Sequence, residues 1–173
     1  GESSYCGDWA DGFPHGSGVE TLQHEIYDGR FKSGKRHGRG ILKTKCNNII
    51  YEGAWEDGLL HGKGIYKYEY QEKNSYEANF KKYEGSFSHG LRSGEGILLL
   101  TDGSRIEGSW VEDRPVSGDW CISYVHGSNF FGLAKCKKNI AMFCLPVPHG
   151  FGTLRHSNGN SYSGSFVDGI YVD

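Results

Sequence analysis

One spacing of aromatic residues and glycines recurs along the chain and constrains its fold more than any other feature. In the stretch YEGAWEDGLLHGKG, which starts at Tyr51, aromatic residues occupy positions one and five, and glycines occupy positions three, eight, twelve and fourteen. Copies of this spacing start near residues 5, 27, 51, 83, 106, 130 and 162. A period of 22 to 24 residues, lengthened by insertions at 68–82 and 135–148, is typical of a stacked repeat architecture.

The residue types within one copy predict an antiparallel β-hairpin. Side chains alternate faces along a strand, so Tyr51, Gly53 and Trp55 share one face, which we interpret as a packing face. The glycine at position eight follows a turn-prone residue and suits a reversal that needs positive φ. The residue after the HGxG pair is β-branched in the four regular copies, as expected for a second strand: Val19, Ile41, Ile65 and Ile97.

A single hairpin is not stable alone in water, so successive hairpins must stack and bury each other's aromatic rows. We therefore expect an all-β fold: an elongated solenoid of stacked antiparallel β-hairpins, with six repeats and a partial seventh, forming one domain over residues 1–173. The insertion at 68–82 predicts an elongated hairpin or a degenerate half repeat. The insertion at 135–148, which ends in prolines, predicts a loop outside the ladder.

No pattern in the chain predicts catalysis, a cofactor or a metal. Histidines recur at one repeat phase, but equivalent atoms one repeat apart are separated by ~10 Å, whereas zinc donors lie ~2 Å from the ion. We expect these histidines to hydrogen-bond their own turns. The glycine pairs run into β-type segments and not into a helix, so they do not predict a phosphate site. No nucleophile or paired carboxylates stand out, and we expect no enzyme activity within these residues.

Composition limits the cellular setting. The five cysteines form no CxxC pair, and we interpret them as free thiols in a reducing compartment: Cys6, Cys46, Cys121, Cys136 and Cys144. No apolar run approaches the ~20 residues of a membrane-spanning helix, and the polar start is not a secretory signal. The net charge of -2 does not favour nucleic acid as a partner. These features predict a cytoplasmic protein.

Two groups of residues are candidates for binding. Seven basic residues lie between positions 30 and 45 with no acidic residue among them, and they suit an anionic membrane or an acidic partner: Arg30, Lys32, Lys35, Arg36, Arg39, Lys43 and Lys45. The second group lies in the apolar insertion: Met142, Phe143 and Leu145. Insertions in solenoids often reach a binding face, but this one could equally fold over the weaker copies of the stack.

The motif YEGxWxxGxxHGxG resembles the MORN repeat (membrane occupation and recognition nexus), and the resemblance covers residues 5 to about 169. It implies a non-catalytic scaffold for protein–protein interaction that binds a partner peptide or helix or self-associates. Similar arrays serve cytoskeletal and ciliary assemblies, and others lie at the membrane periphery.

The same resemblance allows another function. MORN arrays also act as regulatory or targeting domains of larger enzymes, such as a SET methyltransferase, a lipid kinase or an alsin-type Rab exchange factor. The chain begins almost at a repeat and stops within one, as expected for a domain of a longer protein. Uncapped end strands would favour a homo-oligomer.

Overall fold

A computed structural model describes residues 3–68, 79–136 and 145–172 of the chain. These residues form one antiparallel sheet of fifteen strands in which neighbours in sequence are neighbours in space, except that the two-residue β10 pairs only with β9. The strands are β1 (Ser4–Ala10), β2 (Phe13–Thr21), β3 (Glu25–Lys32), β4 (Lys35–Thr44), β5 (Ile49–Glu56), β6 (Leu59–Lys67), β7 (Phe80–Ser88), β8 (Leu91–Leu100), β9 (Arg105–Val111), β10 (Arg114–Pro115), β11 (Gly118–Ser123), β12 (Asn129–Cys136), β13 (Pro146–Arg155), β14 (Ser161–Val167) and β15 (Ile170–Val172).

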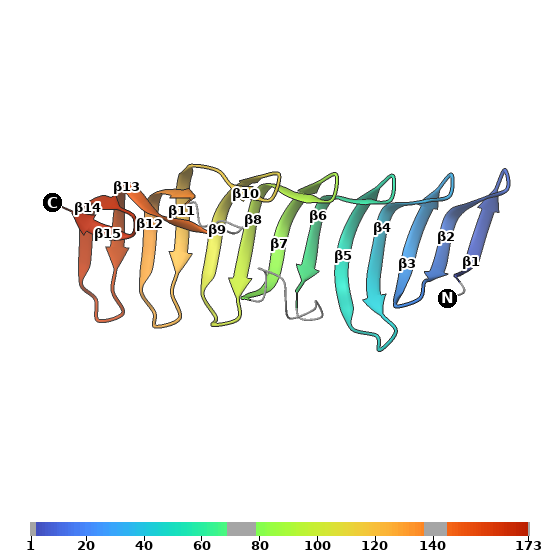
Figure 1. Cartoon of the computed structure of the whole chain (residues 1–173), viewed down its shortest axis with the longest axis horizontal. Coiled ribbons are helices and arrows are strands. Elements are labelled where there is room, and N and C mark those ends of the chain that lie inside the picture. The colour runs from blue at the N-terminus through green and yellow to red at the C-terminus, as the bar shows by residue number, and fades with distance from the viewer. Residues whose placement is uncertain (1–2, 69–78, 137–144, 173) are drawn as a thin grey trace.

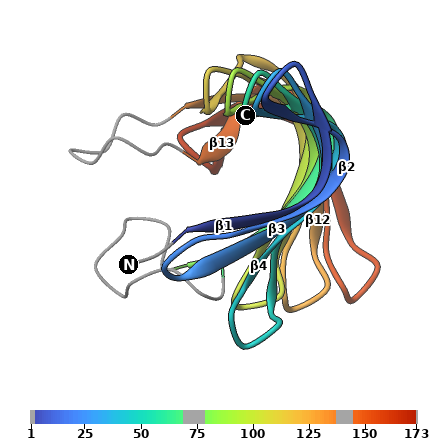
Figure 2. The ribbon, with the colours of Figure 1, turned by 90° about the vertical axis from the view of Figure 1, so that its right-hand side faces the viewer.

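The molecule is a long ribbon of hairpins with its two termini at opposite ends (Figure 1). Seen along the length of the molecule, the strands themselves are strongly curved, so the sheet has a C-shaped outline (Figure 2). No helix occurs in the part of the chain that the structure describes. The predicted all-β solenoid of stacked antiparallel hairpins is confirmed.

Tight turns of one type close the hairpins. At the tip between β5 and β6, Asp57 and Gly58 have φ values of 50° and 88°, as a type I′ turn requires. The Gly58 N–H also donates a hydrogen bond of 2.9 Å to the carbonyl of Arg36 in the preceding hairpin. The Gly90 N–H bonds the Leu60 carbonyl in the same way, also at 2.9 Å. The glycine that recurs at position eight thus forms part of the turn, and its N–H also links neighbouring copies.

The central contact of each of the four regular copies is a tyrosine ring lying on a pair of glycines. Gly53 on β5 pairs with Gly64 on β6, and a Cβ atom on either glycine would overlap the ring of Tyr51. The strand register shifts immediately after Gly53, and the Tyr51 hydroxyl donates a 2.9 Å hydrogen bond to the carbonyl of Ala54 at that bulge. The missing side chains make room for the ring, and the ring hydroxyl satisfies the carbonyl that the bulge leaves unpaired.

The rings of neighbouring copies contact each other edge to face. The Tyr27 ring centroid lies 5.1 Å from that of Phe31 in its own strand and 5.1 Å from that of Trp55 in the next copy. The Tyr51 ring makes equivalent contacts at 5.3 Å with Trp55 and 5.4 Å with Phe87. Three first-position tyrosines are fully buried: Tyr27, Tyr51 and Tyr83. Since the described residues form a single layer, the bend of the sheet itself encloses this aromatic face.

The copies that start at Ile106 and Phe130 keep the register with different residues. The Trp120 ring lies on Gly108, where a regular copy has a tyrosine, and Trp120 pairs with Gly132 across the strands. Its Nε1–H donates a 2.9 Å bond to the carbonyl of Val116. The Phe130 ring lies on Gly152. Tryptophan and phenylalanine rings therefore fill the same space above the glycine row as tyrosine does.

Two expectations need correction. Residues 135 and 136, which were predicted to lie in a loop outside the ladder, end β12, and residues 146 to 148 begin β13 and pair with residues 134 to 136. Residues 137–144 of the predicted loop lie outside the described residues. The expectation of free thiols is wrong for Cys136, which is disulfide-bonded. Cys6, Cys46 and Cys121 are free.

Replacing Gly53 by alanine should lower the free energy of unfolding by about 3 kcal/mol, because the added methyl group overlaps the buried Tyr51 ring and the Gly64 backbone. The matched control is Gly118→Ala, where an added Cβ meets no atom within 4 Å; its effect should stay within about 0.5 kcal/mol. Denaturant unfolding measures both. Equal effects of the two substitutions would contradict the proposed packing.

The chain should lose stability at alkaline pH. Burial raises the pKa of Tyr27 and of Tyr51 to about 12, from 10.0. The folded pKa lies above the unfolded pKa, so the stabilisation is complete below about pH 10 and disappears as the pH rises towards about 12. The free energy of unfolding and the tyrosinate absorbance should change together over this range. Ionisation of these phenols near pH 10 without loss of β-structure would show that they are not buried.

Candidate binding surface

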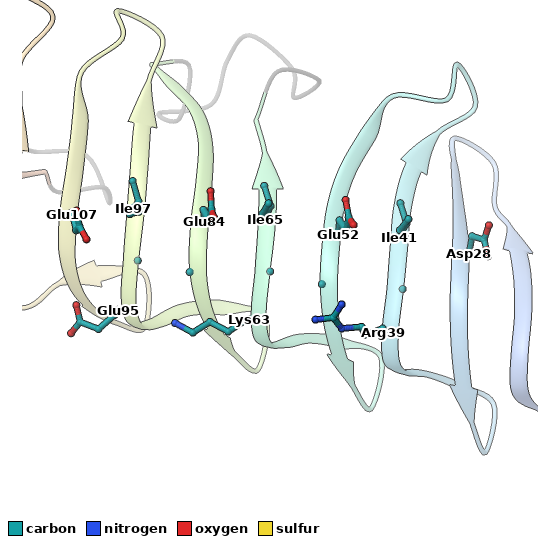
Figure 3. Close-up of a pocket in the computed structure, with 15 residues that line it drawn as sticks. Asp28, Arg39, Ile41, Glu52, Lys63, Ile65, Glu84, Glu95, Ile97 and Glu107 are labelled. Atoms are coloured by element: carbon teal, nitrogen blue, oxygen red, sulfur yellow. The ribbon is translucent and has the colours of Figure 1, made fainter.

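A groove runs along the face opposite the aromatic rings. The rings and the glycines share one face of the sheet. The side chains of the residues before and after each glycine therefore point to the opposite face. They line a groove of ≈ 710 Å³ that crosses the strands from β3 to β9 (Figure 3). Its floor is the backbone of the glycine row: Gly40, Gly53, Gly64, Gly85 and Gly96. We call this side of the sheet the groove face.

One wall of the groove alternates carboxylates with isoleucines. Residues paired across successive strands form this row: Asp28, Ile41, Glu52, Ile65, Glu84, Ile97 and Glu107. Because neighbouring strands lie ~4.8 Å apart, like side chains recur about every 10 Å along the wall. The opposite wall carries Arg39, Lys63 and Glu95 (Figure 3).

Two of the wall carboxylates already have partners. Glu84 lies 3.3 Å from the Lys82 ammonium, and Glu107 lies 2.9 Å from the Arg105 guanidinium. Both ion pairs are exposed and therefore contribute little to stability. The two carboxylates can exchange these intramolecular partners for basic groups of a bound protein. The groove therefore combines apolar contacts with charges of both signs, as protein-binding surfaces do.

The sequence analysis missed these groove residues although their signal was present. The acidic residue at position two and the β-branched residue after HGxG were interpreted only as strand formers. The residue at position two precedes the position-three glycine. Its side chain therefore points away from the aromatic ring that covers that glycine. The register that places an isoleucine between successive carboxylates is set by strand pairing, and the chain order alone did not indicate it.

Most of the predicted basic residues lie on the groove face. Alternation along β3 and β4 places five of them there, and we call these five the basic surface: Arg30, Lys32, Lys35, Arg39 and Lys43. None of the five forms an ion pair with a residue that the structure describes. Lys45 follows the end of β4 and is exposed.

Arg36 lies on the aromatic face. Its Nη2 atom is 2.8 Å from a carboxylate oxygen of Glu20, and its guanidinium lies 4.9 Å from the Tyr27 ring centroid and 5.3 Å from that of Trp55. Its side chain is only 16% exposed. Arg36 therefore covers the aromatic row and is not available to a membrane together with its basic neighbours.

The apolar candidates have different positions. Leu145 is partly buried and packs against the core. Met142 and Phe143 lie outside the described residues. As candidates for binding, these residues remain a prediction.

In the described part of the chain, two histidines lie beside carboxylates near the turns, and the histidines do not gather into a metal-binding cluster. His61 lies 3.2 Å from Glu56 of its own hairpin, and His149 lies 3.7 Å from Asp168 at the next turn. The buried Nδ1 atom of His37 has no hydrogen-bond partner among the described residues, so the predicted turn bonding is not general. Within residues 3–68, 79–136 and 145–172, three or more His, Cys, Asp or Glu side chains nowhere gather as a metal site would require.

Comparison with known families identifies the repeat. The MORN repeat matches residues 5–23, 27–44, 51–69, 83–105 and 147–161. The chain belongs to the MORN repeat family. The matches omit the stretch from 106 to 146, where Trp120 and Phe130 take the place of the usual tyrosines. MORN repeats are usually interaction or membrane-binding modules, and the family is generally non-catalytic.

One relative extends over most of this MORN array. The chain is 27% identical over 156 residues to alsin of Rattus norvegicus, an alignment that covers 87% of this chain and 7% of alsin. The MORN array thus corresponds to a small part of that protein. Among the described residues, no helix has the length and hydropathy needed to cross a membrane.

Replacing Arg36 by alanine should lower the free energy of unfolding by about 2 kcal/mol, because it removes the Glu20 ion pair and the contact with two aromatic rings. The matched control is Arg39→Ala, because Arg39 lies on the same strand and is exposed. This substitution should change the free energy of unfolding by less than about 0.5 kcal/mol. Thermal and denaturant unfolding compare the two. Equal losses would show that Arg36 does not support the aromatic row.

Proposed function

We propose that this MORN array is a non-catalytic protein-binding module that holds a helical partner segment along its groove face. The groove between β3 and β9 supports this function, because it presents apolar isoleucines and unburied charges in a regular row. The aromatic face, by contrast, is used internally. A partner therefore meets the chain through the side chains that flank the glycines.

The direction of the strands favours a helix over an extended peptide. The strands cross the groove, so a segment lying along it would run perpendicular to them. The backbone groups of the inner strands are already paired with each other, and an extended segment in the groove would leave its own N–H and C=O groups without partners. A helix satisfies these groups internally and presents only side chains.

The helix and the groove also have similar spacings. Residues seven apart on a helix are separated by ~10.5 Å along its axis, and the isoleucines of the groove recur about every 10 Å. The stretch from β3 to β9 spans six strand spacings, or about 29 Å, which matches a helix of about 19 residues. Apolar side chains seven positions apart would meet Ile41, Ile65 and Ile97 in turn.

The module belongs, in this proposal, to a longer protein in which it has a regulatory or targeting role. The similarity to a short portion of alsin supports this setting. Catalysis would then reside outside these residues, and the MORN array would supply a binding surface. A scaffold in which the array alone recruits a cytoskeletal partner is the other form of the same function.

Attachment to an anionic membrane is a second candidate, favoured by the five unpaired cations of the basic surface. Such residues contribute about 1 kcal/mol each near an anionic lipid surface. Because they share one face, they can approach a flat membrane together. End-to-end association through the outer strands likewise stays a prediction.

Substituting two groove isoleucines should remove the protein partner. Ile65→Arg combined with Ile97→Arg places two charges among the apolar contacts, and the protein captured from cytosol by the native chain should fall at least about tenfold. Val111→Arg combined with Val125→Arg is the control, since both valines are exposed and neither lines the groove. Quantitative mass spectrometry compares the captures. Unchanged capture by the groove variant would refute the proposed site.

Charge reversal tests the membrane candidate. Lys32→Glu, Lys35→Glu and Lys43→Glu together, with Arg36 left intact, should abolish flotation with phosphatidylserine vesicles at low salt while leaving the groove partner bound, because these three lysines do not line the groove. Raising the ionic strength should have the same effect on the native chain, because salt screens these charges. If the native chain does not float with these vesicles at low salt, the lipid candidate fails and the protein-binding function stands.

A further inference from the structure

The groove face changes character in the copies that depart from the repeat. Beyond β9, the carboxylate–isoleucine row continues as Cys121 on β11 and Phe131 on β12, which pair with each other across the strands. An open depression of ≈ 470 Å³ lies here, next to the main groove. It is lined by Glu95, Glu107, Gly108, Asp119, Trp120, Cys121, Phe131 and Gly132.

Among the described residues, the charged side chains that line this depression are all acidic: Glu95, Glu107 and Asp119. They come from successive strands of the sheet, β8, β9 and β11, so they span about 10 Å. Glu95 accepts a hydrogen bond from the Ser109 hydroxyl, and Glu107 pairs with Arg105. Asp119 is exposed and forms no ion pair with any residue in the described ranges.

Exposed apolar side chains adjoin these carboxylates. Phe131 is 46% exposed and lines the depression, and Leu133, which pairs with Asp119, is 43% exposed. Phe151 on the neighbouring strand β13 is 65% exposed. At the repeat position of Phe131 the regular copies from Tyr27 onwards carry a carboxylate, and at that of Phe151 they carry a charged residue. Aromatic and aliphatic groups left in water beside a polar rim mark a site of interaction.

We propose that this depression, the acidic pocket, binds an arginine side chain of the partner, and that Leu133 and Phe151 receive an apolar residue next to that arginine. The planar guanidinium bonds a carboxylate such as Asp119 in two places and stacks on an aromatic ring such as Phe131. Its methylene stem would lie on the apolar floor, while the charge remains at the rim.

This inference rests on the proposed protein-binding function and names part of what the partner must contain. The main groove has charges of both signs and does not select a basic segment. The acidic pocket does, because none of the described residues that line it is basic. A partner helix that fills the groove would therefore be oriented with its arginine-bearing end towards β12.

Cys121 provides a reporter within the pocket. It is a free cysteine and partly exposed, and Cys6 and Cys46 are free thiols outside the pocket. A short peptide carrying alternating arginine and leucine should slow the alkylation of Cys121, measured by mass spectrometry, by at least about tenfold at saturation. The alkylation of Cys6 and Cys46 should stay unchanged in the same sample.

Two peptides of equal length serve as controls. Replacing arginine by citrulline removes the charge and keeps the shape, and replacing leucine by serine removes the apolar residue; each should bind at least about tenfold more weakly. Asp119→Asn should weaken binding of the arginine–leucine peptide to a similar extent without changing stability, because Asp119 forms no ion pair with a described residue. Phe151→Ser should weaken it too, whereas Val125→Ser, at 63% exposure in the connection between β11 and β12 and outside the pocket lining, should not.

Equal protection of Cys121 by the arginine and citrulline peptides, or no protection by either, would overturn the arginine assignment. That result would leave the groove function standing if the Ile65→Arg and Ile97→Arg chain still loses its captured partner. Conversely, loss of peptide binding only in the Asp119 and Phe151 variants, with capture unaffected by the groove substitutions, would place the partner at the acidic pocket alone.

Discussion

The structure depends on the contact between an aromatic ring and two facing glycines. Tyr51 lies where the Cβ atoms of Gly53 and Gly64 would be, and its hydroxyl bonds the carbonyl that the bulge exposes. A single-layer sheet has no second sheet or helix to bury its apolar side chains. Here the bend at the bulge and the rings of adjacent copies take that role, so each repeat is stable only when its neighbours are present.

This packing also determines where function can reside. On one face of the sheet, the aromatic rings cover the glycine row. The side chains that flank the glycines lie on the opposite face, where a partner can reach them. The groove, the basic surface and the acidic pocket all lie on that second face. Arg36 illustrates the division, because it belongs to the basic segment in sequence but covers the aromatic row in space.

The hairpins, their turns and the aromatic core could be predicted because each depends on local residue types. Asp57 and Gly58 adopt the positive φ values that their turn position requires. The position-one tyrosines of the inner copies are buried as the alternation indicated: Tyr27, Tyr51 and Tyr83. The insertions and the irregular copies were harder. Nothing in the local sequence around Trp120 indicates that its ring replaces a tyrosine above Gly108, since that contact joins two strands through their register.

The sequence by itself determined the repeat, the hairpin and the direction in which each side chain points, because period, turn chemistry and strand alternation act within a few residues of each other. Only the tertiary structure decided which side chains meet. It aligned Asp28, Ile41 and Glu52 into one wall and brought Asp119 beside Leu133. It also paired Arg36 with Glu20 across two strands. These contacts depend on how each hairpin is aligned with its neighbour, which bulges and lateral hydrogen bonds fix only once the copies are stacked.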